Sequence, residues 1–335
     1  MTADMPAGSS AHDVSSPACD RRGFLKAAAA ALPLTAAAAS AADAPSDAKA
    51  DPLLTGPVVV KDPLPRIRLG KHSVSRLICG NNCFGAGSHL SVFVNKEMRA
   101  YYTPEQILRT LRRCEQAGIN TWQASLGMMD TWRRYLDTGG KMQFITIETD
   151  NPETIAKLAA GGCIASAHHG EATDSLFKQG KLDQVGDFLK RVHDAGMQAG
   201  VSTHMSDVVD AVESKGWQVD YYMTCLYERH RSRKALLQLL GHVPIPVGEV
   251  YLESDPPRMF KAIQATKRPC LAFKILAAGR LCERIEIVDM AFRETFEAIK
   301  PADAVIVGIY DKFDDQAAQG AAFVRRYGRA PDQGA

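Results

Sequence analysis

The sequence lacks the features that mark several common classes of protein. Its cysteines include no Cys-x-x-Cys pair, so their spacing indicates no zinc or iron–sulfur site. The 40 basic and 38 acidic side chains nearly cancel, and no long run of one sign follows the first part of the chain. This balance argues against a nucleic-acid-binding surface. No apolar run reaches the length of a stable transmembrane span.

The beginning of the chain has the composition of an export signal. Arg21 and Arg22 precede Phe24-Leu25-Lys26, and an alanine-rich apolar stretch follows. Paired arginines before a short apolar stretch are typical of substrates of the twin-arginine pathway. We therefore predict export through the twin-arginine translocation machinery, with the mature protein in the periplasm or cell envelope.

Composition also predicts how the chain is divided. Small residues around Ala41 indicate that a signal peptide over 1–41 ends there. A polar, proline-containing stretch predicts a flexible tether over 42–63. The remainder, 64–328, is long enough for one large α/β domain, and 329–335 is predicted to be a disordered tail.

Short apolar runs alternate with amphipathic stretches after the tether, which is the pattern of βαβ units and a parallel sheet. Thr103-Pro104 and Asn151-Pro152 each place a capping side chain before a proline in the first helical turn. The eight apolar runs are 76–80, 119–123, 144–148, 162–169, 198–203, 219–225, 269–274 and 304–308.

Eight strands and eight helices in single file predict an α/β fold of the (β/α)8 TIM-barrel type. A doubly wound open sheet is the alternative, but the chain has no Gly-x-Gly-x-x-Gly loop after its first strand. In a barrel all parallel strands end on one face, so residues that terminate different runs converge there. These residues are Asn81, Asn82, Gln123, Glu148, His168, His169, His204, Tyr227, Glu228, Lys274 and Tyr310.

Several short segments occur in a characteristic order along the chain. They are Arg68-Leu69-Gly70-Lys71, Val74-Ser75-Arg76-Leu77, Phe84-Gly85, Ala117-Gly118-Ile119-Asn120-Thr121, Gly200-Val201-Ser202-Thr203, Val219-Asp220-Tyr221-Tyr222-Met223 and Phe273-Lys274-Ile275-Leu276-Ala277-Ala278-Gly279-Arg280. Through the order of these segments the chain resembles the aldo-keto reductase superfamily over roughly 65–326. The resemblance implies an aldo-keto-reductase-like barrel that transfers hydride from a nicotinamide cofactor.

The resemblance also implies a tetrad of Asp, Tyr, Lys and His, in which the tyrosine donates a proton to the carbonyl. The positions that match this tetrad are Gln123, Met128, Glu148 and His169, so only the histidine is kept. Methionine cannot donate a proton, and a glutamate removes the positive charge that would lower the pKa of a tyrosine. We therefore expect altered chemistry rather than ordinary carbonyl reduction.

The cofactor prediction comes from the same resemblance. It places the adenosine phosphate of NADP(H) at 307–312, with Gly308 and Lys312 as cofactor-binding residues. Three acids would repel a phosphate there, and the glutamate and asparagine usual in the last helix are replaced by Gln319 and Gly320. The acids are Asp311, Asp314 and Asp315.

Our first hypothesis is an enzyme that acts on a sugar or small carbonyl compound by altered acid–base chemistry. Glu148, His169, His204 and Lys274 are the predicted catalytic residues, with Lys274 binding an oxyanion or a carboxylate. The predicted substrate-binding residues are Asn81, Asn82, Gln123, His168, Tyr227 and Glu228. The histidines, together with Glu148 and with Glu228 or Glu249, also suit a divalent metal in a mixed site.

Other interpretations stay open. Glu148 and Lys274 could form a buried ion pair without a chemical role, and single histidines often merely cap a strand. A second hypothesis keeps nicotinamide redox chemistry with His169 or Tyr102 as the acid, and a third is a catalytically inactive ligand-binding barrel. The loop 85–102 is long enough for a lid, and the basic run 229–234 is either a solvated helix start or an attractor of anions. The sequence leaves a monomer or a dimer open.

Overall fold

The computed structural model describes residues 51–245 and 249–329. The predicted signal peptide, the first part of the predicted tether and residues 330–335 of the predicted tail lie outside this range. Within it, no helix is both long and apolar enough to cross a membrane.

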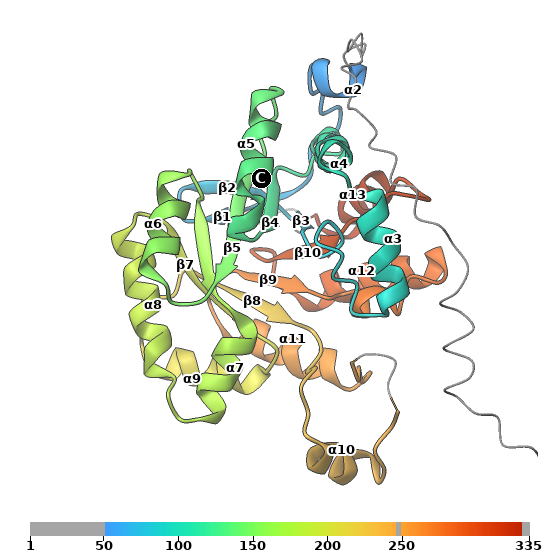
Figure 1. Cartoon of the computed structure of the whole chain (residues 1–335). Coiled ribbons are helices and arrows are strands. Elements are labelled where there is room, and N and C mark those ends of the chain that lie inside the picture. Colours follow the sequence, from blue (N-terminus) through green and yellow to red (C-terminus); the bar gives the residue numbers. More distant parts are fainter. Residues whose placement is uncertain (1–50, 246–248, 330–335) are drawn as a thin grey trace, which may run out of the picture. The chain divides into compact units, whose positions relative to one another are not determined.

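Eight parallel strands form a closed barrel (Figure 1). Each strand pairs with the next in the chain, and β10 closes the ring by pairing with β3 in register, Ile306 opposite Ile78. The predicted (β/α)8 TIM barrel is therefore confirmed. The strands are β3 Leu77–Gly80, β4 Thr121–Ala124, β5 Gln143–Glu148, β6 Ala165–His168, β7 Gln198–Thr203, β8 Tyr221–Cys225, β9 Cys270–Phe273 and β10 Ala304–Gly308.

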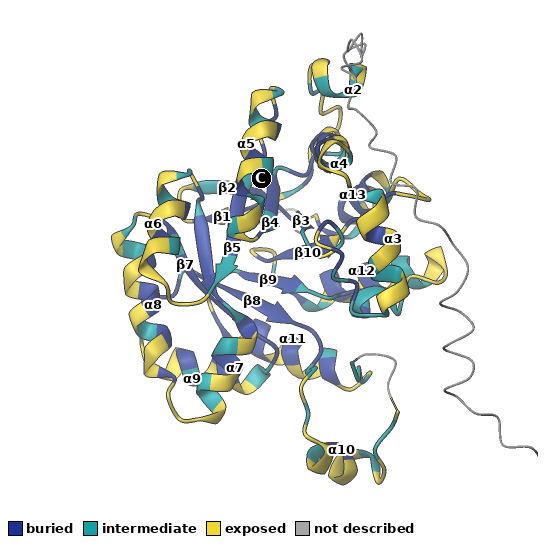
Figure 2. Ribbon diagram, in the orientation of Figure 1, coloured by how far each residue is buried: buried dark blue, intermediate teal, exposed yellow. Residues whose placement is uncertain are grey.

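The strands are almost wholly buried, and the surrounding helices bury one face each (Figure 2). This pattern follows from the short apolar runs, because a strand covered on both sides needs no polar face. Large and small residues interlock inside the barrel. A Cβ added to Gly200 would lie 2.5 Å from Cζ of Tyr221, so glycine is required where that ring fills the interior.

Helices follow the strands, and the predicted caps form at two of them. The side chains of Thr103 and Asn151 accept hydrogen bonds from Gln106 N and Thr154 N at the starts of α4 and α6. The helices around the barrel are α4 Pro104–Gln116, α5 Met129–Asp137, α6 Pro152–Ala160, α7 Gly170–Lys178, α8 Asp183–Asp194, α9 Ser206–Ser214, α11 Asp255–Ala265, α12 Ile285–Ala298 and α13 Gln316–Tyr327.

The structure differs from the sequence prediction at several helices. From the sequence, Ser206 or Asp207 would be expected to cap the helix α9, but Met205 precedes this helix and no side chain caps it. Helices α7 and α12 were not assigned from the sequence. The loop after β3 contains a further helix, α3 Val92–Tyr101, and the excursion after β8 contains α10 Arg233–Leu240.

An antiparallel hairpin, β1 Arg66–Leu69 and β2 His72–Ser75, precedes the barrel. Its buried side chains Ile67, Leu69 and Val74 pack in one apolar cluster with residues at the amino ends of the barrel strands, such as Ala304. The hairpin therefore closes the amino end of the barrel, and the opposite end is left for a site.

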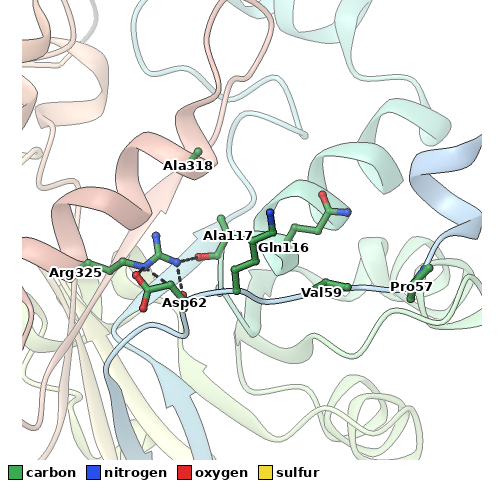
Figure 3. A pocket seen from close by; sticks show the side chains of 8 residues that line it. Pro57, Val59, Asp62, Gln116, Ala117, Ala318 and Arg325 are labelled. Carbon is green, nitrogen blue, oxygen red and sulfur yellow. Dashed lines mark hydrogen bonds and ion pairs between the residues drawn. The ribbon is translucent and has the colours of Figure 1, made fainter.

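The described part of the predicted tether, residues 51–63, lies along the barrel. It contains the short helix α2 Pro52–Thr55, and Arg112 of α4 donates a hydrogen bond to Leu54 O at 2.9 Å. A hollow of about 550 Å³ lies beside this segment. Arg325 of α13 pairs there with Asp62 at a distance of 2.7 Å (Figure 3). No histidine, glutamate or cysteine lines this hollow.

Candidate functional site

A pocket of about 420 Å³ opens at the carboxyl ends of the barrel strands. It is smaller than the hollow of Figure 3, but it is the one that gathers imidazoles, amides and an ammonium group. We therefore take it as the candidate site. The predicted site residues that line it are Asn81, Asn82, Gln123, His169, His204, Lys274 and Gly308.

Glu148 and His168, at the end of one strand and the next, do not line this pocket. Oε1 of Glu148 accepts hydrogen bonds from Leu126 N at 3.1 Å and Thr146 Oγ1 at 2.9 Å, so it braces the connection after β4. The alternative interpretation, an ion pair of Glu148 with Lys274, is not observed among the described residues.

The side chain of His168 points toward the helices instead. Its Nδ1 lies 2.8 Å from Thr173 Oγ1, and its ring meets the ring of Phe188 at 5.1 Å. Burial lowers the pKa of His168 to about 4. Side chains alternate between the two faces of a strand, so His168 and His169 point in different directions. The prediction that His168 binds substrate in the pocket with the other site residues therefore assigned it to the wrong face of β6.

The other three predicted residues outside the pocket have partners of their own. Tyr227 packs its ring on Tyr251 at 4.9 Å, and Glu228 accepts hydrogen bonds from Arg231 at 3.2 Å and, at 3.4 Å, from Arg258. Lys312 is paired with Glu97 of α3 at 2.5 Å.

Two triads of carboxylate, imidazole and cation surround the pocket. The first, which we call the arginine triad, consists of Asp174, His204 and Arg229. His204 Nδ1 lies 2.8 Å from Asp174 Oδ2, and Arg229 Nη1 lies 3.2 Å from His204 Nε2. A guanidinium can only donate hydrogen bonds, so Nε2 accepts and Nδ1 carries the proton donated to Asp174. Burial lowers the pKa of His204, although Asp174 opposes this.

The local sequence explains how this triad forms. Helix α7 begins at Gly170, directly after β6, and one turn later Asp174 faces the end of β7. Its Oδ1 accepts a hydrogen bond from Thr203 Oγ1 at 2.5 Å. A Cβ on Gly170 would lie 3.0 Å from Cε1 of His204, so the missing side chain lets the helix start against the ring.

The second triad, which we call the lysine triad, consists of Glu249, His89 and Lys274. His89 Nδ1 lies 3.1 Å from Glu249 Oε1, and Lys274 Nζ lies 2.9 Å from His89 Nε2. Asn82 Nδ2 also lies 3.0 Å from Nε2. With Nδ1–H donated to the carboxylate, Nε2 holds the lone pair that accepts from Lys274.

The two triads meet at Glu249, whose Oε1 pairs with Arg229 as well as His89. Arg229 is also 3.0 Å from Glu171 Oε1. Burial alone would lower the pKa of Arg229, but the hydrogen bond with Glu249 and the charges of both carboxylates raise it. Burial would raise the pKa of Glu249, and hydrogen bonds from His89, Arg229 and Tyr251 hold it well below its usual range instead.

The lysine triad has strained backbone. His89 and Lys274 both have positive φ, 58° and 60°, a region that residues with a Cβ rarely adopt. Arg280 holds the segments in place, because its Nη2 donates to His89 O and to Glu249 O, each at 3.1 Å. Its guanidinium also lies 4.1 Å from the Tyr251 ring centroid.

Lys274 and His169 both line the pocket, and neither has an ion-pair partner among the described residues. No carboxylate oxygen of the described residues lies within 4.0 Å of the Lys274 ammonium. Burial lowers the pKa of Lys274, and the charge of Arg229 lowers it further. The charges of Cys225, Glu249 and Glu171 act in the opposite direction, but the net pKa is still lowered. The ring of His169 makes no hydrogen bond with any described residue.

The sequence analysis missed part of this arrangement. Arg229 was noted only as part of a basic run, His89 only as part of the loop after β3, and Glu249 only as an alternative to Glu228. Asp174 was not selected, although it follows the histidine strand within one helical turn. Only its distance from the strand end, one turn into a helix, could have indicated it.

The loop after β10 does not suit the adenosine phosphate of NADP(H). Asp311 is buried there, accepting hydrogen bonds from Tyr102 and Thr110 and pairing with Arg113 at 2.9 Å. Lys312 is tied to Glu97 and does not line the pocket. The residues present therefore do not fit this cofactor, and we route no step through it.

The described residues also do not provide the mixed histidine and carboxylate site predicted for a divalent metal. Across the residues that the structure describes, no three His, Cys, Asp or Glu side chains group so as to hold one ion. The imidazoles of both triads are instead held between a carboxylate and a cation.

Comparison with known proteins finds no matching family model and no matching curated protein. Solved structures do resemble the barrel. The glycerol dehydrogenase AKR11B4 from Gluconobacter oxydans aligns at 12% identity and a TM-score of 0.46, over 81% of this chain and 98% of that chain. A truncated 3-deoxy-D-arabino-heptulosonate 7-phosphate synthase from Thermotoga maritima aligns at 11% identity and 0.46, over 79% and 91%.

An N-acetylneuraminic acid synthetase from Leptospira borgpetersenii aligns at 11% identity and a TM-score of 0.45, covering 81% of this chain and 92% of that chain. These likenesses concern the barrel fold alone. The barrel fold itself is shown by the strand pairing.

Proposed function

We propose that this barrel is an enzyme that moves a proton at the carbon next to the carbonyl group of a small sugar-like or keto compound. The observation that carries the proposal is the placement of Lys274 and His169 in one pocket: a cation without a carboxylate partner and an imidazole without a hydrogen bond, both among the described residues. Isomerisation, epimerisation and elimination all begin with such a proton transfer.

Lys274 supplies the electrostatic part of this chemistry. When a proton leaves the carbon next to a carbonyl, negative charge develops on the carbonyl oxygen. A fixed cation in a partly buried site stabilises that charge more than water does. Arg229 is less suited to this role, because Glu171 and Glu249 already balance its charge.

His169 supplies the base. It stands at the junction of β6 and α7, where its backbone N–H donates to Glu148 O at 2.8 Å and its O accepts from Thr173 N at 2.8 Å. The backbone is therefore fixed while the ring faces the pocket. An imidazole in this position takes the proton from the substrate carbon and returns it to the same or the neighbouring carbon.

The remaining lining fits a small polar ligand. A volume of about 420 Å³ lies near the lower end of the range for small-molecule sites. Asn81, Gln123 and Ser202 offer amide and hydroxyl groups to substrate hydroxyls, while Met223 and Phe273 cover the carbon skeleton. Oδ1 of Asn81 is buried and has no hydrogen-bond partner among the described residues, so a substrate hydroxyl would satisfy it.

The test is solvent hydrogen exchange. The protein without residues 1–41 is incubated in D2O with hydroxyacetone or dihydroxyacetone, and loss of the carbon-bound proton next to the carbonyl is followed by NMR. We expect exchange with the wild type, and slower exchange with His169→Gln and Lys274→Met. His242→Gln, at an exposed histidine, serves as the matched control. Equal exchange by wild type and His169→Gln would overturn the assigned base.

We also propose that the chain is exported by the twin-arginine pathway. The support is the pair Arg21 and Arg22 before Phe24-Leu25-Lys26. Replacing both arginines by lysine should leave the unprocessed chain in the cytoplasm, whereas the wild type should appear, shortened, in the periplasmic fraction. Export of the lysine variant at the wild-type level would contradict this route.

A further inference from the structure

The lysine triad has the arrangement needed to convert an ammonium into a free amine. Lys274 Nζ lies 2.9 Å from the acceptor nitrogen of His89, and the other nitrogen of His89 lies 3.1 Å from the carboxylate of Glu249. A proton that leaves Lys274 therefore has an acceptor within hydrogen-bond distance. The resulting imidazolium is stabilised by the carboxylate behind it.

We infer that Lys274 forms a covalent Schiff base with the carbonyl carbon of the substrate, activated by His89 and Glu249. The inference rests on the proposed function for its carbonyl substrate, but it assigns Lys274 a bond rather than a charge. Lysine amines that become nucleophiles are commonly those placed in a desolvated pocket or beside another cation. The first of these conditions holds here, since Lys274 is partly buried in the pocket.

The step balances in atoms and protons. Nε2 of His89 takes one proton from the Lys274 ammonium, and the lone pair on Nζ attacks the carbonyl carbon. The N–C bond forms, and a proton moves from Nζ to the oxygen to give a carbinolamine. His89 then returns its proton to the hydroxyl, water leaves, and an iminium remains. No electrons are gained or lost, and the iminium makes the neighbouring carbon acidic for His169.

The alternative nucleophiles and bases are less suited. Arg229 ends the other triad but cannot lose its proton under ordinary conditions. Lys312, also on the side of the barrel where the strands end, is paired with Glu97 outside the pocket. The titratable and charged groups that face Lys274 are His89, His204, Cys225, Arg229, Glu171 and Glu249.

The backbone gives independent support. Both Lys274 and His89 hold a left-handed conformation, which costs free energy and persists only where the surroundings enforce it. At His89 the surroundings include Arg280, which donates hydrogen bonds to the backbone oxygens of His89 and Glu249. A lysine needed only as a distant charge would not require this precise placement against an acceptor nitrogen.

The experiment is reductive trapping. The protein without residues 1–41 is incubated with pyruvate or dihydroxyacetone, sodium borohydride is added, and tryptic peptides are analysed by mass spectrometry. We expect a secondary amine at position 274. Lys274→Arg should lose the adduct completely while keeping the charge, and Lys312→Met should keep it. Circular dichroism of each variant verifies that it is folded.

The role of His89 is tested by the pH profile of trapping. His89→Gln should slow adduct formation by roughly 10²-fold near neutral pH. At alkaline pH, where solvent deprotonates the lysine, its rate should approach that of the wild type. A purely structural role would instead lower the rate equally at all pH values, and that result would overturn the assignment of His89.

Trapping and hydrogen exchange separate the two proposals. Exchange with an adduct at 274 supports both. Exchange without any adduct overturns the Schiff base and leaves the proposed proton transfer in place, with Lys274 acting by charge. An adduct without exchange keeps the Schiff base and overturns the proton transfer. Absence of both, or an adduct at other lysines only, overturns the Schiff base.

Discussion

The arginine triad and the lysine triad place the same kinds of group in the same order: a carboxylate, an imidazole and a cation. In the arginine triad the cation is bound by Glu171 and Glu249, and its pKa is raised. In the lysine triad the cation has no carboxylate of the described residues within 4.0 Å, and burial lowers its pKa.

The two triads also differ in backbone conformation. His89 and Lys274 have positive φ, whereas neither His204 nor Arg229 does. An imidazole hydrogen-bonded to a carboxylate therefore does not by itself determine what a triad does. The role depends on whether the final cation can release a proton and on how far its charge is already balanced. We therefore propose that the arginine triad has a structural role, holding Glu171 and Glu249 in place, and that the lysine triad is the reactive one.

The largest expected effect is on activity. Lys274→Met should reduce solvent hydrogen exchange by about 10²- to 10³-fold, because it removes the cation that meets the developing oxyanion. The rate is measured by NMR at saturating hydroxyacetone. The unfolding free energy should change little, since no ion pair is broken among the described residues. Full exchange activity in Lys274→Met would end the distinction between the triads.

Arg229→Met should mainly reduce stability. Its side chain is 9% exposed and lies between Glu249 and Glu171, so its loss leaves a partly buried carboxylate without its partner. We expect the unfolding free energy to fall by about 3 kcal/mol, measured by urea denaturation at pH 7. A variant as stable as the wild type would show that the ion pairs of Arg229 do not stabilise the fold.

His168 sharpens the comparison because it is an imidazole outside both triads. Its folded pKa of about 4 lies below the unfolded value near 6.5, so the unfolded chain binds a proton first as the pH falls. Stability from this residue is present above pH 6.5 and declines toward pH 4, by up to about 3 kcal/mol. His168→Gln should flatten this decline in urea denaturation and leave exchange activity unchanged. Reduced exchange would instead return His168 to the site.

The smallest expected effects come from neutralising one carboxylate in each triad. Glu249→Gln should move the pH midpoint of Lys274 reactivity downward, because a nearby negative charge no longer favours the ammonium. Asp174→Asn should not move it, since Asp174 contacts His204 rather than the lysine triad. The midpoint is read from acetylation of Lys274 at a series of pH values. Equal shifts of the Lys274 midpoint in both variants would mean that Asp174 influences Lys274 as strongly as Glu249 does, and the two triads would then not be electrostatically distinct.

The sequence predicted the barrel because its determinants are local. Each strand is an apolar run, and helix starts such as Thr103-Pro104 carry their caps in adjacent residues. The contacts of residues 51–63 were not predicted, since they join segments far apart in the sequence. The bond from Arg112 to Leu54 O, for example, joins residues 58 positions apart.

Sequence-based prediction reached the candidate pocket where a residue lies at the carboxyl end of a strand. Gln123, His204 and Lys274 line the pocket for this reason, because parallel strands converge at their carboxyl ends. It failed for His89 and Glu249, which lie on loops whose course depends on distant anchors. Arg280 binds the backbone oxygen of His89 across 191 positions, and no local pattern encodes such a contact.

The central claim is that Lys274, which has no carboxylate partner among the described residues, is more reactive than an ion-paired lysine. Competitive acetylation of the folded protein across a pH series tests this claim most directly. Acetic anhydride acetylates a lysine only in its uncharged amine form, and mass spectrometry measures the labelling of Lys274 and Lys312 in the same sample. Burial lowers the pKa of Lys274, whereas the ion pair with Glu97 raises that of Lys312. We predict a labelling midpoint for Lys274 below that for Lys312. A midpoint for Lys274 equal to or above that of Lys312 would contradict the account.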